Sequence, residues 1–296
     1  MKIGTQLGFS DGLQLAEEEV FKHLAEAGFD CVDYPLMLEG YDSPLWQLPD
    51  IELRNKMEST KKVIHQNGLT VCQTHSPLDA YWWGNISTKE ARWNAQIQAI
   101  KASAFLGSPY VVVHPLTSTY RVDKQKYEEA KQINMEYYRF LEPYLKEYNV
   151  KAAIENLFGY DPYNRTCRSI CSTASNLKDY IDTLDSDRFV VCLDVGHATL
   201  ALQEPVEMIY ELGKDYLHVT HMHDNCHLSD DHMMPGFGKL DWFAIGKALH
   251  DIGYEGVFNF EADRPYYKLG EYTQELSLEL LKMYAQLSKA IVHYVP

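Results

Sequence analysis

Six short apolar segments of this chain each end in a histidine or an acidic residue. They read LTVCQTH, YVVVH, KAAIE, FVVCLD, LHVTH and VFNFE, and their last residues are His75, His114, Glu155, Asp194, His221 and Glu261. The gaps between these last residues are 39, 41, 39, 27 and 40 residues. A gap of this size accommodates one strand, one helix and their connections. The spacing indicates consecutive β/α units, each ending in a residue type that binds metal ions.

The alternation continues over the whole chain and predicts an α/β fold, a (β/α)₈ TIM barrel. Strand-like runs lie at 2–7, 30–34, 69–75, 110–114, 150–157, 189–195, 216–223 and 256–262. Amphipathic segments lie near 13–27, 50–67, 88–106, 124–149, 173–184, 203–213, 241–252 and 270–292. Strands that alternate with helices of this length favour a parallel sheet. Because no Pro- or Gly-rich linker divides the chain, we expect a single TIM-barrel domain over residues 1–296.

In such a barrel the C-terminal ends of all strands meet at one mouth, where the active site lies. Side chains alternate between the two faces of a strand, so Ala153 shares a face with Glu155, and Cys192 with Asp194. If these faces point inward, the residues that end the strands gather around the mouth.

Four of these residues form the predicted metal site: Glu155, Asp194, His221 and Glu261. Carboxylates with an imidazole suit Mn²⁺, Mg²⁺, Co²⁺ or Zn²⁺. For a single acid at the end of a strand, a structural salt bridge is the simpler interpretation. Four such residues, each closing an apolar strand, favour one or more divalent metal ions.

Further polar residues lie near the same mouth. His75, His114 and His197 are candidates for a second metal ion or for hydrogen bonds to a substrate, and the alternative is that they orient metal ligands. His197 belongs to the sequence D-V-G-H, in which Gly196 permits a sharp turn. Asp230 and His232 have D-x-H spacing and could reach a metal from the loop after the seventh strand.

Two other loop features have both a functional and a structural interpretation. Gly236 and Gly238 form a G-x-G turn at a position that often binds phosphate in barrels, and the alternative is a tight turn. Trp82 and Trp83 directly follow the third strand and could form one wall of a sugar-sized pocket. Packing that anchors the loop, or a subunit contact, explains them equally well.

Charge and composition restrict the partners. The net charge of −15 argues against nucleic acid, whose binding needs a basic face that neutralises phosphates. No apolar stretch reaches the roughly 18 residues of a membrane helix, and the start MKIGTQLGF lacks the pattern of a signal peptide. We therefore expect a cytoplasmic protein with a small-molecule partner. A homo-oligomer is compatible with the sequence, which does not determine the oligomeric state.

These motifs resemble the xylose isomerase-like TIM barrel superfamily, which contains sugar isomerases and epimerases, inosose dehydratases and endonuclease IV-like proteins. The resemblance spans the whole chain. It is carried by T-H-S-P at 74–77, V-H-P at 113–115, I-E-N at 154–156, L-D-V-G-H at 193–197, H-M-H-D at 221–224, P-G-F-G at 235–238 and F-E at 260–261.

The two branches of the family imply different sites. The epimerase-like branch implies one divalent ion bound by the four residues above, with Glu155 and Glu261 also acting as an acid/base pair. The endonuclease branch implies three zinc ions held by nine residues, which are His75, His114, Glu155, Asp194, His197, His221, Asp230, His232 and Glu261. Ketose epimerases that resemble this chain usually have an arginine where His232 stands.

The resulting hypothesis is a metal-dependent sugar or polyol isomerase or epimerase. One glutamate removes the proton next to the substrate carbonyl, giving an enediolate, and the other glutamate returns a proton. The alternatives are an inosose dehydratase-like lyase, in which the second acid protonates a leaving hydroxyl, and a zinc phosphodiesterase that acts on abasic DNA.

Overall fold

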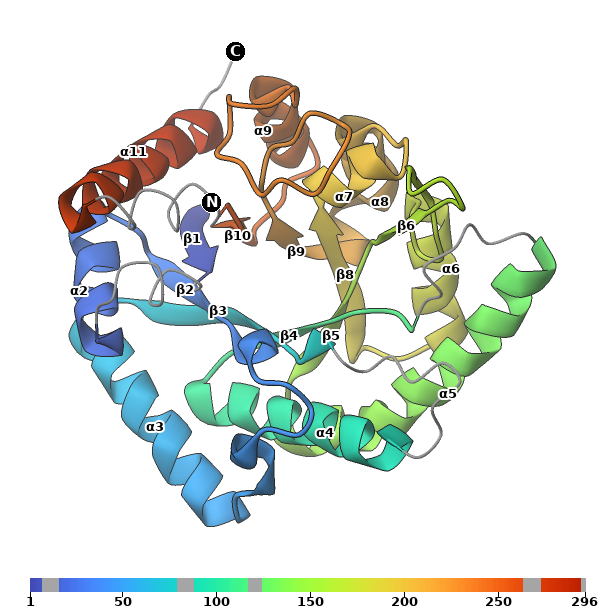
Figure 1. Cartoon of the computed structure of the whole chain (residues 1–296), viewed down its shortest axis with the longest axis horizontal. Coiled ribbons are helices and arrows are strands. Elements are labelled where there is room, and N and C mark those ends of the chain that lie inside the picture. The colour runs from blue at the N-terminus through green and yellow to red at the C-terminus, as the bar shows by residue number, and fades with distance from the viewer. Residues whose placement is uncertain (7–15, 79–87, 117–123, 263–272, 294–296) are drawn as a thin grey trace.

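The computed structural model describes residues 1–6, 16–78, 88–116, 124–262 and 273–293. Its centre is a sheet of eight parallel strands in the order β10-β1-β2-β3-β4-β5-β8-β9, and a parallel bridge between Met222 and Phe260 joins the two outer strands (Figure 1). The strands are β1 (Lys2–Gln6), β2 (Cys31–Tyr34), β3 (Thr70–His75), β4 (Tyr110–Val113), β5 (Lys151–Glu155), β8 (Phe189–Asp194), β9 (Leu217–His221) and β10 (Val257–Phe260).

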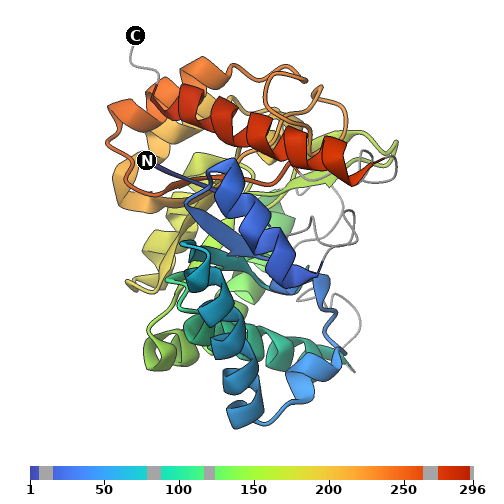
Figure 2. The same ribbon diagram turned by 90° about the vertical axis from the view of Figure 1, so that its left-hand side faces the viewer.

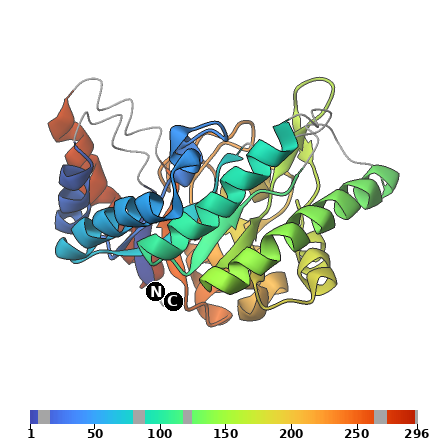
Figure 3. The ribbon, with the colours of Figure 1, turned by 90° about the horizontal axis from the view of Figure 1, so that it is seen from below.

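Helices surround this sheet, as the views from the side and from below show (Figures 2 and 3). They are α2 (Glu17–Ala27), α3 (Asp50–Gln66), α4 (Lys89–Leu106), α5 (Lys124–Tyr148), α6 (Ala174–Leu184), α8 (Pro205–Tyr216), α9 (Trp242–Asp251) and α11 (Gln274–Val292). The predicted (β/α)₈ barrel is confirmed. Within the described parts of the chain, no helix is both long enough and apolar enough to cross a membrane.

The alternation of side chains along the strands produces two hydrophobic cores. Outward-facing residues such as Val111, Val113 and Ile154 pack against the helices in the larger core. Inward-facing residues form a small separate cluster inside the barrel, made of Val112, Ala153, Val190, Cys192 and Val219. Full burial of each large aliphatic side chain contributes roughly 1.5–3 kcal/mol. Because Ala153 and Cys192 point inward, Glu155 and Asp194, two residues later, also point inward at the mouth.

Five short elements lie outside the predicted alternation. The 3₁₀ turns η1 (Leu36–Leu38) and η2 (Pro44–Gln47) follow β2, and the antiparallel hairpin of β6 (Phe158–Tyr160) and β7 (Thr166–Arg168) follows β5. Helix α7 (Val195–Leu200) directly follows β8 and lies beside this hairpin (Figure 1). Asp161 closes the hairpin, since its carboxylate accepts hydrogen bonds from the backbone N–H groups of Tyr163 and Arg165, both at 2.9 Å.

Candidate metal centre

The ends of four strands bring the predicted metal ligands together. Glu155, Asp194 and His221 are the last residues of β5, β8 and β9, and Glu261 directly follows β10. One ligand atom from each of the four residues lies within 4.8 Å of the others, and all four residues are buried. The barrel thus gathers side chains that are up to 106 positions apart in the sequence.

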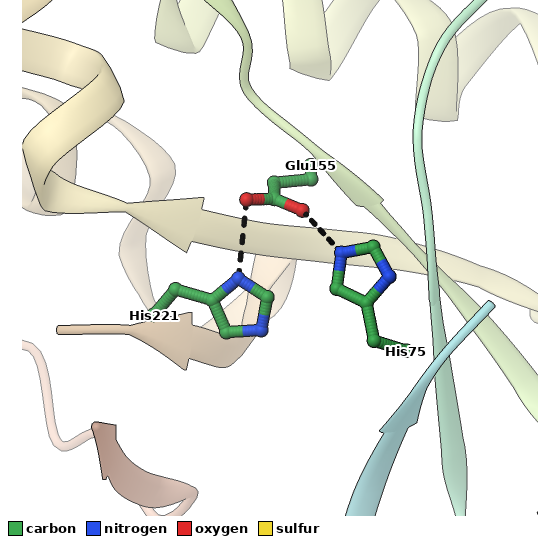
Figure 4. A group of neighbouring side chains, drawn as sticks. All are labelled: His75, Glu155 and His221. Atoms are coloured by element: carbon green, nitrogen blue, oxygen red, sulfur yellow. Dashed lines mark hydrogen bonds and ion pairs between the residues drawn. The ribbon is translucent and has the colours of Figure 1, made fainter. Parts of the chain in front are cut away.

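Glu155 is the most heavily contacted member of this cluster. Its Oε2 atom lies 3.2 Å from Nε2 of His75 and 3.0 Å from Nε2 of His114. Its Oε1 atom lies 3.1 Å from Nδ1 of His221 and 3.4 Å from Nδ1 of His197. Figure 4 shows two of these imidazoles, His75 and His221, each facing a different oxygen of the carboxylate. One buried carboxylate therefore interacts with histidines that end β3 and β9, with one that directly follows β4 and with one in α7.

Glu261 shares His221 with Glu155. Nδ1 of His221 lies 2.9 Å from Oε2 of Glu261. The other carboxylate oxygen, Oε1, accepts a hydrogen bond of 3.1 Å from the side-chain amide of Gln6 in β1. The same imidazole nitrogen therefore faces two carboxylates at once.

The end of β8 is fixed by the residue that follows β5. The side-chain amide of Asn156 donates to the backbone carbonyl of Asp194 at 2.8 Å, and its Oδ1 accepts from the Asp194 N–H at 2.7 Å. The Asp194 carboxylate caps α7 by accepting the N–H of His197 at 2.7 Å. The two hydrogen bonds of Asn156 thus link the I-E-N and D-V-G-H motifs, because Asn156 fixes the end of the strand whose last residue is Asp194.

A second group of residues lies beside Asp194. His223 Nε2 is 3.0 Å from the Asp194 carboxylate, and the ring of His223 stacks on that of His232 with centroids 4.3 Å apart. Nε2 of His232 lies 3.0 Å from Asp230, which is also 3.7 Å from Nε2 of His197. The D-x-H loop pair and His197 are thus close to one another.

Gly196 has a different role from the turn that the sequence suggests. It lies within α7 and does not have a positive φ. A Cβ atom at this position would lie 2.0 Å from Cε1 of His223. The absence of a side chain therefore makes room for the imidazole of His223.

The G-x-G turn contacts a carboxylate of the chain itself. Asp224 is buried, and its carboxylate accepts hydrogen bonds from the N–H groups of Gly236 at 2.9 Å and Leu240 at 3.2 Å and from the indole of Trp242 at 2.9 Å. A Cβ atom on Gly238 would lie 2.2 Å from Oδ1 of Asp224. The glycines thus bring the backbone close to a carboxylate of the chain itself, in agreement with the tight-turn interpretation.

Mutual electrostatic interactions shift the pKa values of the site. Burial alone would raise the pKa of Glu155, but the imidazoles of His221 and His114 hold it well below its usual range. Burial opposes the charged form of His221, yet the surrounding Cys192, Glu261 and Glu155 raise its pKa well above the usual value. Burial likewise opposes the charged form of His197, but the nearby carboxylates of Asp194 and Asp230 raise its pKa well above the usual value.

This donor set fits a divalent cation. Glu155, Asp194 and Glu261 are buried carboxylates, and in the described parts of the chain their ion-pair partners are histidines rather than lysines or arginines. Buried carboxylates need a compensating charge, and imidazoles neutralise them only when protonated. Oxygen and nitrogen donors without a thiolate suit Mn²⁺, Mg²⁺, Co²⁺ or Zn²⁺.

Three residues of the site were not predicted from the sequence: Gln6, Asp33 and His223. Asp33 is buried near the end of β2 and lies 3.4 Å from His221. The sequence did contain a signal for Asp33, because this residue is itself an acid near the end of an apolar, strand-like run, as the predicted ligands are. His223 shares a strand face with His221 but was not selected as a ligand. Trp82 and Trp83, the predicted pocket wall, lie outside the described residues.

A model of the family described as xylose isomerase-like TIM barrel matches residues 21–284. The chain belongs to this family. A D-psicose 3-epimerase from Ruminiclostridium cellulolyticum is 25% identical over 251 residues, which cover 83% of this chain and 77% of the epimerase. An inosose isomerase from Bacillus subtilis is 28% identical over 171 residues, which cover 55% of this chain and 58% of the isomerase.

Other similar proteins are matched over only part of their length or at low sequence identity. Two further relatives, 32% and 30% identical, are matched over 53% and 54% of their length, so the chain spans about half of each. The solved structure of the IOLI protein with a bound zinc atom has a TM-score of 0.71 and 18% identity, with 99% of this chain and 98% of that chain covered. At this identity the likeness establishes the shared fold alone.

Proposed function

We propose that this protein is a divalent-metal-dependent isomerase or epimerase of a sugar or polyol. The observation that carries the proposal is the buried cluster of Glu155, Asp194, His221 and Glu261 at the mouth of the barrel, whose ligand atoms lie within 4.8 Å of one another. We assign these four residues as the metal ligands. The relatives that act as a sugar epimerase and an inosose isomerase support the reaction class.

Glu155 and Glu261 are the proposed acid/base pair. Both carboxylates face Nδ1 of His221, at 3.1 and 2.9 Å, so they flank one point from two strands of the barrel. One carboxylate removes the proton on the carbon next to the substrate carbonyl, and the other delivers a proton. When bound, the ion supplies Lewis-acid polarisation of the substrate oxygens.

The remaining histidines support this pair. His75 and His114 contact Oε2 of Glu155 and so fix the orientation of its carboxylate. His197, Asp230 and His232 lie on the side of Asp194 and bind substrate hydroxyl groups or a second ion in the proposed site. An inosose dehydratase-like lyase would use the same residues, with the second acid protonating a leaving hydroxyl group.

A second candidate is a zinc phosphodiesterase that acts on abasic DNA. One observation favours it: the residue types of the three-zinc pattern are present, and two overlapping groups of these residues lie close enough to hold an ion. The net charge of −15 argues against binding to a polyanion. Metal stoichiometry separates the candidates, because the sugar enzyme requires one ion per chain and the nuclease three.

The direct test of the reaction class is proton exchange. Metal-loaded protein is incubated in D₂O with a panel of ketoses, aldoses and inososes, and the sugars are followed by NMR. The proposal predicts deuterium incorporation next to the carbonyl of at least one sugar, and its loss after chelation or in Glu261→Gln. Exchange with none of the panel, together with cleavage of abasic duplex DNA, would replace the proposal with the nuclease.

A further inference from the structure

Beneath the proposed ligands the barrel contains a buried carboxylate that has no assigned role. Asp33 in β2 is 0% exposed. Its Oδ2 atom accepts hydrogen bonds from the side-chain amides of Gln73 in β3 at 2.9 Å and of Asn259 in β10 at 3.0 Å. The same oxygen lies 3.4 Å from Nε2 of His221 in β9. Residues from three other strands thus surround one carboxylate oxygen inside the barrel.

A buried charge is costly unless it is paired and hydrogen-bonded. In the described parts of the chain, the ion-pair partner of Asp33 is His221. The two amides cannot carry a compensating charge, but they fix the position of Oδ2 on the side of the imidazole. The contact between Asp33 and His221 is therefore the one through which this carboxylate can influence the site.

The two nitrogens of His221 face different surroundings. Nδ1 faces the carboxylates of Glu155 and Glu261, at 3.1 and 2.9 Å. Nε2 is buried and has no hydrogen-bond partner within the described residues, and the carboxylate oxygen that faces it is Oδ2 of Asp33, at an ion-pair distance of 3.4 Å. A histidine that binds a metal through one nitrogen carries its proton on the other, and the partner of that N–H sets the tautomer and the ring orientation.

We infer that Asp33 is a positioning residue, which accepts the Nε2–H of His221 and so presents the lone pair of Nδ1 to the metal. Gln73 and Asn259 hold Asp33 in place for this task. The inference rests on the proposed function, because it assumes that His221 is a metal ligand. It assigns no proton transfer with substrate to Asp33, which is separated from the mouth by the ring of His221.

The first test measures metal affinity. Zn²⁺ is titrated into metal-free protein in competition with a chromophoric chelator, for wild type and for Asp33→Asn and Asp33→Ala. Loss of a carboxylate that orients a metal-binding histidine weakens metal binding about 10- to 100-fold. Asp30→Asn is the matched control, since Asp30 is an exposed acid three residues earlier that accepts the N–H of Ile3 at 2.9 Å. The control is expected to stay within about twofold of wild type.

A double-mutant comparison shows whether Asp33 acts through His221. In a His221→Ala background, Asp33→Asn should cause no further loss of Zn²⁺ affinity, because the imidazole that it orients is gone. Equal losses in both backgrounds would overturn the inference, since Asp33 would then act on the site by another route.

The last test needs no variant at position 33, so it remains decisive if those variants fail to fold. Wild-type protein labelled with ¹⁵N-histidine is loaded with Zn²⁺, and the signals of His221 are identified by their loss in His221→Gln. We expect a proton on Nε2, protected from exchange with water, and a metal-bound Nδ1. A metal-bound Nε2 would overturn the inference while leaving the proposed function intact. Wild-type protein that binds no Zn²⁺ would overturn the proposed function itself.

Discussion

Nδ1 of His221 lies 2.9 Å from Oε2 of Glu261. These two residues come from adjacent positions in the barrel, at the end of β9 and directly after β10, and both are buried. The same nitrogen contacts Glu155 on the other side, at 3.1 Å. An imidazole between two buried carboxylates is an arrangement in which one divalent ion can replace the imidazole proton and bind all three groups.

Replacing either carboxylate of the proposed acid/base pair should nearly abolish the proposed reaction. Glu155→Gln and Glu261→Gln retain the size of the side chain but cannot accept a proton, so we expect turnover to fall by about 100- to 10,000-fold. Steady-state kinetics with saturating metal measures the effect. Glu255→Gln is the control, because Glu255 is exposed in the turn before β10. A variant of Glu155 or Glu261 with normal turnover would show that the assignment is wrong.

Metal binding should strengthen as the pH rises. In the metal-free protein the pKa of His221, a proposed ligand, is raised, so at low pH a metal ion must displace a proton from its imidazole. Glu155 has a lowered pKa and therefore does not compete in this way. Calorimetric titrations in buffers of different ionisation enthalpy measure the protons released. An affinity that stays constant from pH 5 to pH 8, with no proton release, would contradict this account.

Gly196→Ala should disturb the group beside Asp194. The new methyl group would meet the ring of His223, and forced overpacking in a core costs about 1–3 kcal/mol of unfolding free energy. Denaturant unfolding measures the loss. In a His223→Ala background the space is free, so the same substitution should cost much less. An equal cost in both backgrounds would mean that the ring of His223 is not the obstacle.

Asp224→Ala should destabilise the loop that carries Asp230 and His232. Four donors, the N–H groups of Asn225, Gly236 and Leu240 and the indole of Trp242, would lose their acceptor. Each buried donor left unsatisfied costs about 1–3 kcal/mol, less where water can enter. Hydrogen exchange measured by mass spectrometry should show faster exchange in residues 225–241. Asp231→Ala in the same loop is the control, and equal exchange in the two variants would contradict the role of Asp224.

The sequence predicts the barrel and the main candidate ligands because both depend on local patterns. The period of strands and helices is visible in the chain, and the alternation within KAAIE and FVVCLD places Glu155 and Asp194 at the mouth. The local pattern could place Asp33 at the end of its strand, but the role that we infer for it depends on contacts with Gln73, Asn259 and His221 from other strands. Such contacts are a consequence of barrel closure.

The close contact between Gly196 and His223 could not be predicted either, because it also joins residues from different β/α units. D-V-G-H suggests a turn when it is considered alone, and only the position of β9 beside β8 shows that an imidazole occupies the space above the glycine. The hairpin of β6 and β7 was also missed, since its strands have three residues each and pair only with each other.

The most direct test of the account is a crystal structure of the metal-loaded protein, with diffraction data collected at the absorption edge of the bound metal. We predict an anomalous peak at roughly 2.0–2.3 Å from side-chain atoms of Glu155, Asp194, His221 and Glu261. A metal-loaded crystal with no peak among these four residues, or with its metal bound elsewhere, would contradict the central claim.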